Sequence, residues 1–250
     1  MIVISGRKNV YRKLGYVADF CPICRSVQAF LVRRIGRASH LYFISLGKGD
    51  LAGFDRICQS CLTPFPTESK KYTQILKNPA PLAELRASTF PNLEEVWQER
   101  LALEARVSNA PLLLSAEERR ELILSPFLLL VPKVERCYNS AVMDKQAGYT
   151  ILGAVLATLA GWAVAGALFP GSGYKLALGI FVIGYSLSLW QILAAKTRRV
   201  TREVVPAIAR GLRPLAPSER EVRDAFATVS AAGHKMGAKL ELSQLLALLK

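Results

Sequence analysis

The sequence lacks the signatures by which many enzymes are recognised. Among its 250 residues there is no Walker loop, no HExxH or GxSxG motif and no paired-carboxylate pattern. A glycine-spaced segment at residues 47–52 (GKGDLA) follows a predicted strand, but Cys58 comes too soon for the helix that a dinucleotide-binding loop must open. We therefore interpret this segment as a hairpin loop and expect a protein that is not an enzyme.

Charge is almost missing from residues 147–195, where Lys175 is the single charged side chain. Apolar runs at residues 147–169 and 174–195 flank a turn rich in proline and glycine. A helix needs roughly 20 apolar residues to cross about 30 Å of hydrocarbon, and a backbone in lipid must satisfy its own hydrogen bonds. The pattern predicts a transmembrane hairpin of two helices. A buried hairpin in a soluble protein is disfavoured, because soluble helices of this length normally carry a charged face.

No N-terminal signal peptide is visible. The apolar run at residues 1–4 is too short for one, and Arg7 and Lys8 follow it. Basic residues flank both long apolar runs and nearly avoid the loop between them: Lys133, Arg136 and Lys145 come before, and Lys196, Arg198, Arg199 and Arg202 come after. By the positive-inside rule we expect two spans in the cell's inner (cytoplasmic) membrane, with both termini in the cytoplasm.

Small residues share one face of each predicted span. They are Gly153, Ala157, Gly161 and Ala165 in the first and, among others, Gly184 and Ser188 in the second. Small side chains let helix backbones approach closely in lipid. A homo-oligomer formed through these faces is one interpretation. Packing between the two helices of one hairpin is favoured, because the partner helix is already tethered.

Basic residues outnumber acidic ones, and the net charge of +14 is unevenly spread. Residues 1–75 hold 12 Lys/Arg against 4 Asp/Glu, a net +8, and residues 196–250 hold 11 against 5, a net +6. Such surfaces suit anionic lipid or nucleic acid, with Arg33, Arg34 and Arg37 as a candidate patch near Phe30 and Tyr42. The favoured explanation is the ordinary excess of Lys and Arg on the cytoplasmic side of membrane proteins.

Four of the five cysteines form two Cys-x-x-Cys pairs, Cys21/Cys24 and Cys58/Cys61, with 33 residues between them. In a reducing cytosol such pairs bind metal more often than they form disulfides. Four thiolates fill the tetrahedral positions of one Zn²⁺ and leave none for water, which is typical of a structural site. Iron, which takes the same ligands, and a redox dithiol remain alternatives.

Short runs rich in branched and aromatic residues at 16–61 predict antiparallel strands around these cysteines. Residues 2–6, 20–24 (FCPIC), 42–47 (YFISLG) and 58–61 (CQSC) resemble a bacterial zinc-ribbon family of largely uncharacterised proteins. The resemblance covers about residues 1–65 and implies zinc at the four cysteines and no particular activity. Family members commonly carry a glycine after the second pair, where this chain has Leu62.

The expected fold class is a small antiparallel β zinc ribbon, then an α-helical region, the two-helix hairpin and a small α-helical tail. The predicted domains are the ribbon (1–65), a proline-rich linker (66–91), a juxtamembrane helical region (92–146), the transmembrane hairpin (147–195) and a cytoplasmic helical tail (196–250). Capping boxes at Ser115/Glu118 and Ser218/Glu221 predict two helix starts.

The sequence therefore predicts a membrane-anchored cytoplasmic binding or scaffolding module with one structural zinc ion and an unidentified cytoplasmic protein partner. Binding of nucleic acid or anionic lipid by the basic N-terminal part is an alternative, with nucleic acid not favoured. An enzyme, or a subunit of an enzyme complex, with a site that the sequence does not reveal, is another. Transport is disfavoured, because no ionisable residue within the spans marks a pathway.

Overall fold

The computed structural model describes residues 5–41, 44–45, 47–139, 145–168 and 173–249. Its N-terminal part is an antiparallel sheet in the order β1-β2-β4-β5, with β3 paired to β2. The strands are β1 (Ser5–Cys21), β2 (Ser26–Leu41), β3 (Ile44–Ser45), β4 (Asp50–Cys58) and β5 (Pro64–Thr67). The predicted antiparallel sheet is confirmed. Tyr42 of the predicted basic patch lies outside the described residues.

The first two strands are longer than their apolar pattern predicts. They pair from Ser5 opposite Leu41 to Cys21 opposite Ser26, with an irregularity between Lys13 and Gly15. Most side chains described at residues 6–14 are exposed. This half of β1 therefore lacks the alternation of apolar and polar residues by which a half-buried strand is predicted. The other half, from Val17 onward, is buried against β2 and the helices.

The segment after β4 packs back onto the sheet. It contains β5, a 3₁₀ turn η1 (Ser69–Lys71) and helix α1 (Leu82–Thr89), and the last two lie within the predicted proline-rich linker. Tyr16 and Leu76 form a β-bridge, and the Ala18 amide donates a 3.0 Å hydrogen bond to Thr89 Oγ1. These contacts cover the end of β1 nearest the cysteines.

Three helices and a 3₁₀ turn connect the sheet region to the apolar helices. They are α2 (Leu93–Val96), α3 (Gln98–Asn109), η2 (Pro111–Leu113) and α4 (Ala116–Asn139). Helix α4 continues through Pro126 and Pro132, although proline in a helix interior normally breaks or kinks the helix. Burial of Phe127, Leu130 and Val134 offsets the hydrogen bonds that the prolines remove.

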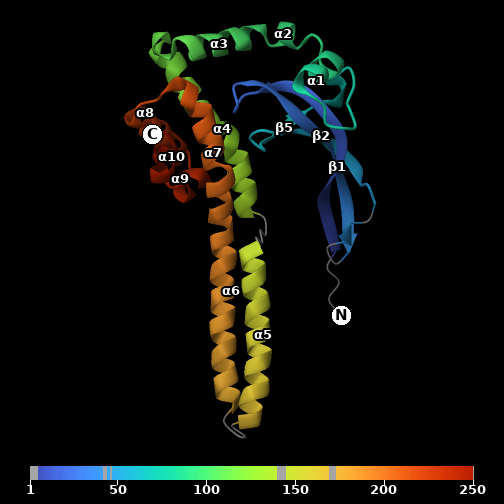
Figure 1. Ribbon diagram of the computed structural model, residues 1–250, viewed down its shortest axis with the longest axis vertical. Helices are drawn as coiled ribbons and strands as arrows, with labels where there is room; N and C mark the ends of the chain where they lie inside the picture. Colours follow the sequence, from blue (N-terminus) through green and yellow to red (C-terminus); the bar gives the residue numbers. More distant parts are fainter. Residues whose placement is uncertain (1–4, 42–43, 46, 140–144, 169–172, 250) are drawn as a thin grey trace.

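Two long helices, α5 (Lys145–Leu168) and α6 (Gly173–Glu203), lie side by side and extend away from the rest of the molecule (Figure 1). The stretches Gln146–Val164 and Leu178–Leu215 each contain an 18-residue apolar window, with mean hydropathies of 1.6 and 1.7, and the helices that carry them are long and apolar enough to cross a membrane. Only 6% and 11% of these windows is buried, so their apolar side chains point outward, unlike those of a soluble core helix.

The chain then returns to pack on α4. The remaining elements are α7 (Val205–Leu212), η3 (Arg213–Leu215), α8 (Glu219–Ala231), α9 (Lys235–Lys239) and α10 (Leu242–Leu249). Phe226 of α8 contacts Phe127 of α4 at 6.5 Å between ring centroids, so the tail docks on the region before the apolar helices. The reciprocal hydrogen bonds of both predicted capping boxes, Ser115/Glu118 and Ser218/Glu221, are confirmed.

Candidate metal centre

The four paired cysteines lie in two tight turns at neighbouring strand ends. Cys21 ends β1, and the chain reverses through Arg25, whose φ is +56°, into β2. The Cys24 amide donates to Cys21 Sγ at 3.4 Å. Cys58 ends β4 opposite Phe30 of β2, and Leu62 donates its amide to the Cys58 carbonyl at 2.9 Å. Pairing of β2 with both β1 and β4 therefore brings the two turns together.

Leu62 adopts the left-handed backbone conformation, with φ +55°. This conformation costs a residue other than glycine about 1–2 kcal/mol. The second turn thus keeps the conformation that a glycine would favour even though the chain has leucine there.

The sulfur geometry fits a tetrahedral ion. The Sγ atoms of Cys21 and Cys61 are 3.7 Å apart, those of Cys24 and Cys58 are 3.8 Å apart, and all four lie within 4.8 Å of one another. Four thiolates at about 2.3 Å from a central zinc would stand about 3.8 Å apart. A disulfide requires about 2.05 Å, and all four cysteines are free. The cluster could therefore hold one metal ion.

The cluster is shielded from solvent. Cys21, Cys58 and Cys61 are buried and Cys24 is half-buried. Hydrogen bonding between the sulfurs of Cys21 and Cys24 raises the pKa of the first thiol and lowers the pKa of the second. The Cys61 pKa is lowered to about 7, chiefly by its hydrogen bond with Cys21. The cluster therefore favours thiolate on some of its sulfurs, and thiolate is the form that binds metal.

Arg25, which follows Cys24 directly, ties the first turn to three helices. Arg25 as a whole is only 7% exposed. Its guanidinium donates to the Gly211 carbonyl at 2.7 Å and to the Leu122 carbonyl at 2.9 Å. It also forms a 2.9 Å ion pair with Glu104 of α3. One residue of the cysteine turn is therefore bound to α3, α4 and α7 at once.

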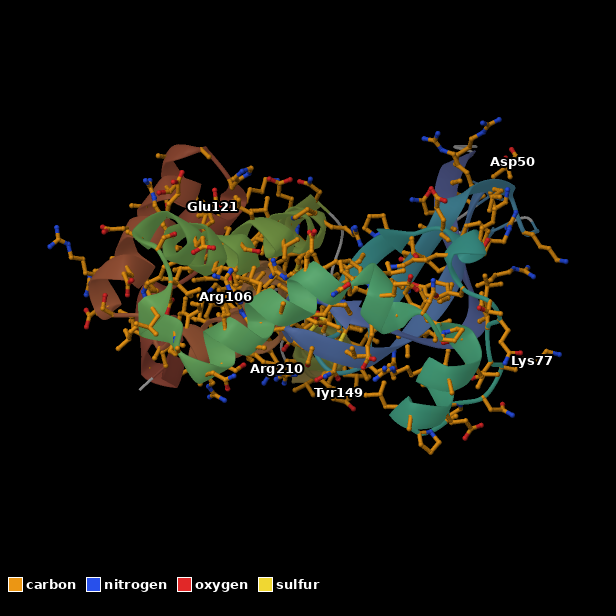
Figure 2. All side chains as sticks on the ribbon, turned by 90° about the horizontal axis from the view of Figure 1, so that it is seen from above. Asp50, Lys77, Arg106, Glu121, Tyr149 and Arg210 are labelled. Atoms are coloured by element: carbon orange, nitrogen blue, oxygen red, sulfur yellow. The ribbon has the colours of Figure 1, made fainter. Side chains whose placement is uncertain are left out.

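The second turn docks on the same helices. Arg210 of α7 donates to the carbonyl and hydroxyl oxygens of Ser60 at 2.7 and 2.9 Å, and Lys133 of α4 donates to the Leu62 carbonyl at 3.2 Å. Figure 2 shows Arg210 near the junction of the helical part with the sheet, and Asp50 at the far end of the sheet. The cysteine cluster thus lies where the sheet joins helices α4 and α7, next to α6.

A buried carboxylate stands two residues before Cys21. Asp19 is fully buried and accepts hydrogen bonds from Lys71 (2.7 Å), Tyr72 (2.8 Å) and Trp97 Nε1 (2.9 Å), and it also pairs with Arg56. Burial, followed by the neighbouring Arg56 charge, lowers the Lys71 pKa to about 8. These contacts fix the segment after β5 and the start of the helical region to β1.

The candidate basic patch is largely engaged within the sheet. Arg33 forms a bidentate ion pair with Asp55, and its guanidinium carbon lies 4.4 Å from the Tyr11 ring centroid. Arg34 donates to the carbonyls of Lys48 and Gly49 at 3.0 and 2.9 Å. Arg37 is exposed. Two of the three guanidiniums therefore stabilise the loop before β4 and the sheet itself.

Among the small residues of the apolar helices, two lie against the other helix of the pair. A Cβ added at Gly184 would meet Ala154 Cβ at 3.0 Å, and one at Gly161 would meet Ile180 at 2.7 Å. Gly153 has open space around it, Ala157 is exposed, and Ser188 lines a cavity between α5 and α6. The side chain of Ala165 lies outside the described residues.

The two polar anchors, Arg25 and Asp19, are missing from the predicted site. The side-chain and carbonyl partners described above lie 37 to 186 residues away along the chain, so no local spacing relates them. The sole signal for Arg25 was its place directly after a metal-type cysteine pair.

Comparison of the chain with family models, curated proteins and solved structures finds no match. The zinc-ribbon resemblance therefore remains a prediction, and the chemistry of the cysteine cluster is argued from its own geometry.

Proposed function

We propose that this chain is a membrane-anchored, non-enzymatic scaffolding protein that uses one structural zinc ion to hold its sheet on its membrane stem. The stem is the pair α5 and α6, acting as a transmembrane hairpin in the inner membrane. In this proposal both termini and the sheet face the cytoplasm, as the flanking Lys and Arg residues indicate.

The observation that carries the proposal is the double docking of the cysteine turns on the stem side of the molecule. Arg25 binds the Gly211 carbonyl, and Arg210 binds Ser60, so both turns contact α7. Helix α7 begins at Val205, directly after α6 ends at Glu203. An ion that fixes the two turns would therefore also fix the sheet relative to the membrane helices.

Zinc is favoured because it prefers tetrahedral thiolate ligands and the cluster supplies four. When bound, the ion would add cross-links between β1, β4 and the turns that follow them. A site closed by four protein ligands gives no place to substrate, which supports a structural role. Cys21, Cys24, Cys58 and Cys61 would hold it.

The scaffolding role is supported by an apolar surface far from the stem. Leu112 and Leu113 in η2 are 80% and 87% exposed, and η2 lies at the end of the molecule opposite the C-terminal end of α5 and the N-terminal end of α6 (Figure 1). Two adjacent exposed leucines are a natural contact for another protein. With the stem in a membrane, this tip would be presented to cytoplasmic partners.

Membrane fractionation combined with elemental analysis tests the proposal. The full chain is expected in the membrane fraction after alkaline washing and, once extracted in detergent, should carry one zinc per chain. Cys21→Ser with Cys58→Ser should reduce zinc to near zero, while the matched control Cys137→Ser retains it. Recovery in the aqueous fraction would contradict the anchor. Iron in place of zinc, or folded metal-free protein, would contradict the structural zinc ion.

A further inference from the structure

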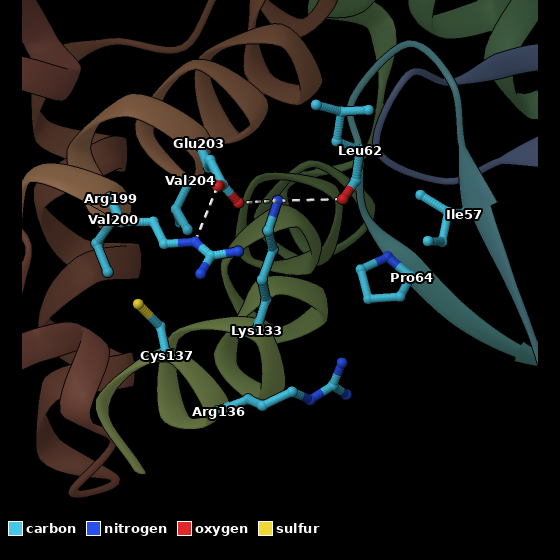
Figure 3. A pocket seen from close by; sticks show the side chains of 10 residues that line it. All are labelled: Ile57, Leu62, Pro64, Lys133, Arg136, Cys137, Arg199, Val200, Glu203 and Val204. Atoms are coloured by element: carbon cyan, nitrogen blue, oxygen red, sulfur yellow. Dashed lines mark hydrogen bonds and ion pairs between the residues drawn. The ribbon is translucent and has the colours of Figure 1, made fainter. Parts of the chain in front are cut away.

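A cavity of about 190 Å³ lies between the second cysteine turn, α4 and α6. Figure 3 shows its lining, with Lys133 and Arg136 from α4, and Arg199 and Glu203 from α6. This volume is many times what one water molecule needs. The wall opposite the charged groups is apolar and includes Ile57 and Pro64 of the sheet region.

The cavity carries excess positive charge. Three cations and one carboxylate line it, which gives a formal net charge of 3 − 1 = +2. Glu203 lies between two of the cations, 3.3 Å from Lys133 and 3.0 Å from Arg199. This one carboxylate is shared by Lys133 and Arg199, so the lining stays positive by formal charge and favours a further anionic oxygen.

The cavity also lies at a specific height on the stem. The uncharged part of α6 ends at Ala195, and Arg199 and Glu203 follow four and eight residues later in the same helix. At 1.5 Å per residue they stand about 6 and 12 Å beyond it. Headgroups occupy about 5–8 Å on each side of the hydrocarbon core. The lower part of the cavity would therefore be level with lipid phosphates.

Aromatic side chains mark the same end of the stem. Tyr149 of α5 and Trp190 of α6 are 72% and 61% exposed and lie within about one and a half turns of the ends of their uncharged runs. Exposed tyrosine and tryptophan are typical of the membrane–water interface. Their position agrees with a headgroup layer just above them.

We propose that this cavity binds the phosphate group of an anionic phospholipid, with Lys133, Arg136 and Arg199 as the cationic lining and the apolar wall against the glycerol region. The inference rests on the proposed membrane anchor. It adds a binding site at the joint between the second cysteine turn and the stem. A free phosphate ion shares the same charge chemistry, and the lipid is favoured by the height of the site and its apolar wall.

Lipid retention by the detergent-purified full chain tests this site. The protein is incubated with equimolar phosphatidylglycerol and phosphatidylcholine of identical acyl chains, and retained lipid is counted by native mass spectrometry. We expect one phosphatidylglycerol per chain in clear preference to phosphatidylcholine. Arg199→Gln should weaken its retention about fivefold, the effect of one cation near a headgroup. The control Arg202→Gln removes the same charge three residues further along α6. Because Arg202 does not line the cavity, this variant should change phosphatidylglycerol retention far less.

Glu203→Gln separates binding from a purely structural ion cluster. Loss of this carboxylate raises the cavity charge from +2 to +3, so phosphatidylglycerol retention should increase, whereas Arg199→Gln decreases it. A structural cluster alone would lose stability in both variants and show no opposite effects on lipid.

Three outcomes would overturn the proposal: equal retention of the two lipids, no difference between Arg199→Gln and Arg202→Gln, or displacement of phosphatidylglycerol by an equal concentration of inorganic phosphate. The failure of the anchor is distinguishable from these. A chain that needs no detergent contradicts the membrane stem, whereas a detergent-dependent chain that retains both lipids equally contradicts only the lipid site.

Discussion

Arg25 is the residue through which the first cysteine turn contacts the helices. It satisfies two carbonyl groups and the Glu104 carboxylate in a buried setting. A buried pair broken on one side typically costs about 3–5 kcal/mol, because the remaining charge stays uncompensated. Arg100 also contacts Glu104, at 2.7 Å, and reduces that penalty.

Replacement of Arg25 by methionine should therefore lower the free energy of unfolding by about 3 kcal/mol and leave the four cysteine ligands in place. The matched control is Arg86→Met, which removes an exposed pair with Glu94 and should cost under about 1 kcal/mol. Denaturant unfolding in detergent measures both. Equal effects of the two variants would contradict the anchoring role of Arg25.

The contrast between the cysteines and these anchors explains what the sequence could reveal at the residue scale. Each Cys-x-x-Cys pair is a local pattern, since both thiols of a pair lie within one turn. Four consecutive residues are therefore enough to indicate metal binding. Arg25 and Asp19 have partners on other elements, so their roles depend on tertiary packing. The same holds for Arg33, whose pairing with Asp55 follows from the register of β2 with β4.

At the scale of elements, Glu221 helps to fix helix α8 to α4 and has two roles. Glu221 completes the capping box with Ser218 and pairs with Arg119 of α4 at 2.5 Å. Hydrogen bonding from Arg119, aided by Ser218, lowers the Glu221 pKa to about 2 from its ordinary 4.5. A lowered carboxyl pKa stabilises the fold above pH 4.5, and this contribution is lost as the pH falls towards 2.

We therefore expect wild-type protein to unfold at a higher temperature than Glu221→Gln at pH 6, and the gap to close as the pH approaches 2.5. Metal release in acid affects both proteins, so it cancels in the difference between their melting temperatures. A gap that is constant across this pH range would show that the Glu221 charge does not hold α8.

The contact between α5 and α6 depends on a close approach at Gly184. Because a Cβ there would already meet Ala154 Cβ at 3.0 Å, Gly184→Leu should push the helices apart and cost about 1–3 kcal/mol. Gly153→Leu is the matched control, since its surroundings are open. Thermal unfolding in detergent should show a loss for the first variant alone.

The same pair of variants distinguishes the two interpretations of the small residues. If the Gly153 face joins two copies of the chain, Gly153→Leu would change the sedimentation of the detergent complex while the hairpin contact stays intact. If small residues serve the contact between α5 and α6, only Gly184→Leu has an effect. The presence of these helices could be predicted from local apolar runs and capping boxes. The face by which α5 and α6 contact each other could not, because it depends on how the two helices pack.

At the scale of the whole molecule, the sheet, the cysteine cluster and the apolar helices were each predictable, but their junction was not. Apolar run length and cysteine spacing are short-range signals. Both cysteine turns dock on α7 through contacts between residues that are far apart in the sequence: Ser60 and Arg210 are separated by 150 positions, and Arg25 and Gly211 by 186. Helix α4 continues through Pro126 at the same junction. The Pro126 ring lies against α7 there, because a Cβ added at Gly211 would meet this ring at 3.0 Å.

The central claim is that one ion at the four cysteines fixes the sheet to the stem. Hydrogen–deuterium exchange of the detergent-purified full chain, before and after metal removal by a chelator, tests it most directly. We expect the amides of α7 and of the two cysteine turns to lose protection when the metal is removed, while α5 and α6 keep theirs. Complete metal loss with unchanged exchange in α7 would contradict the claim.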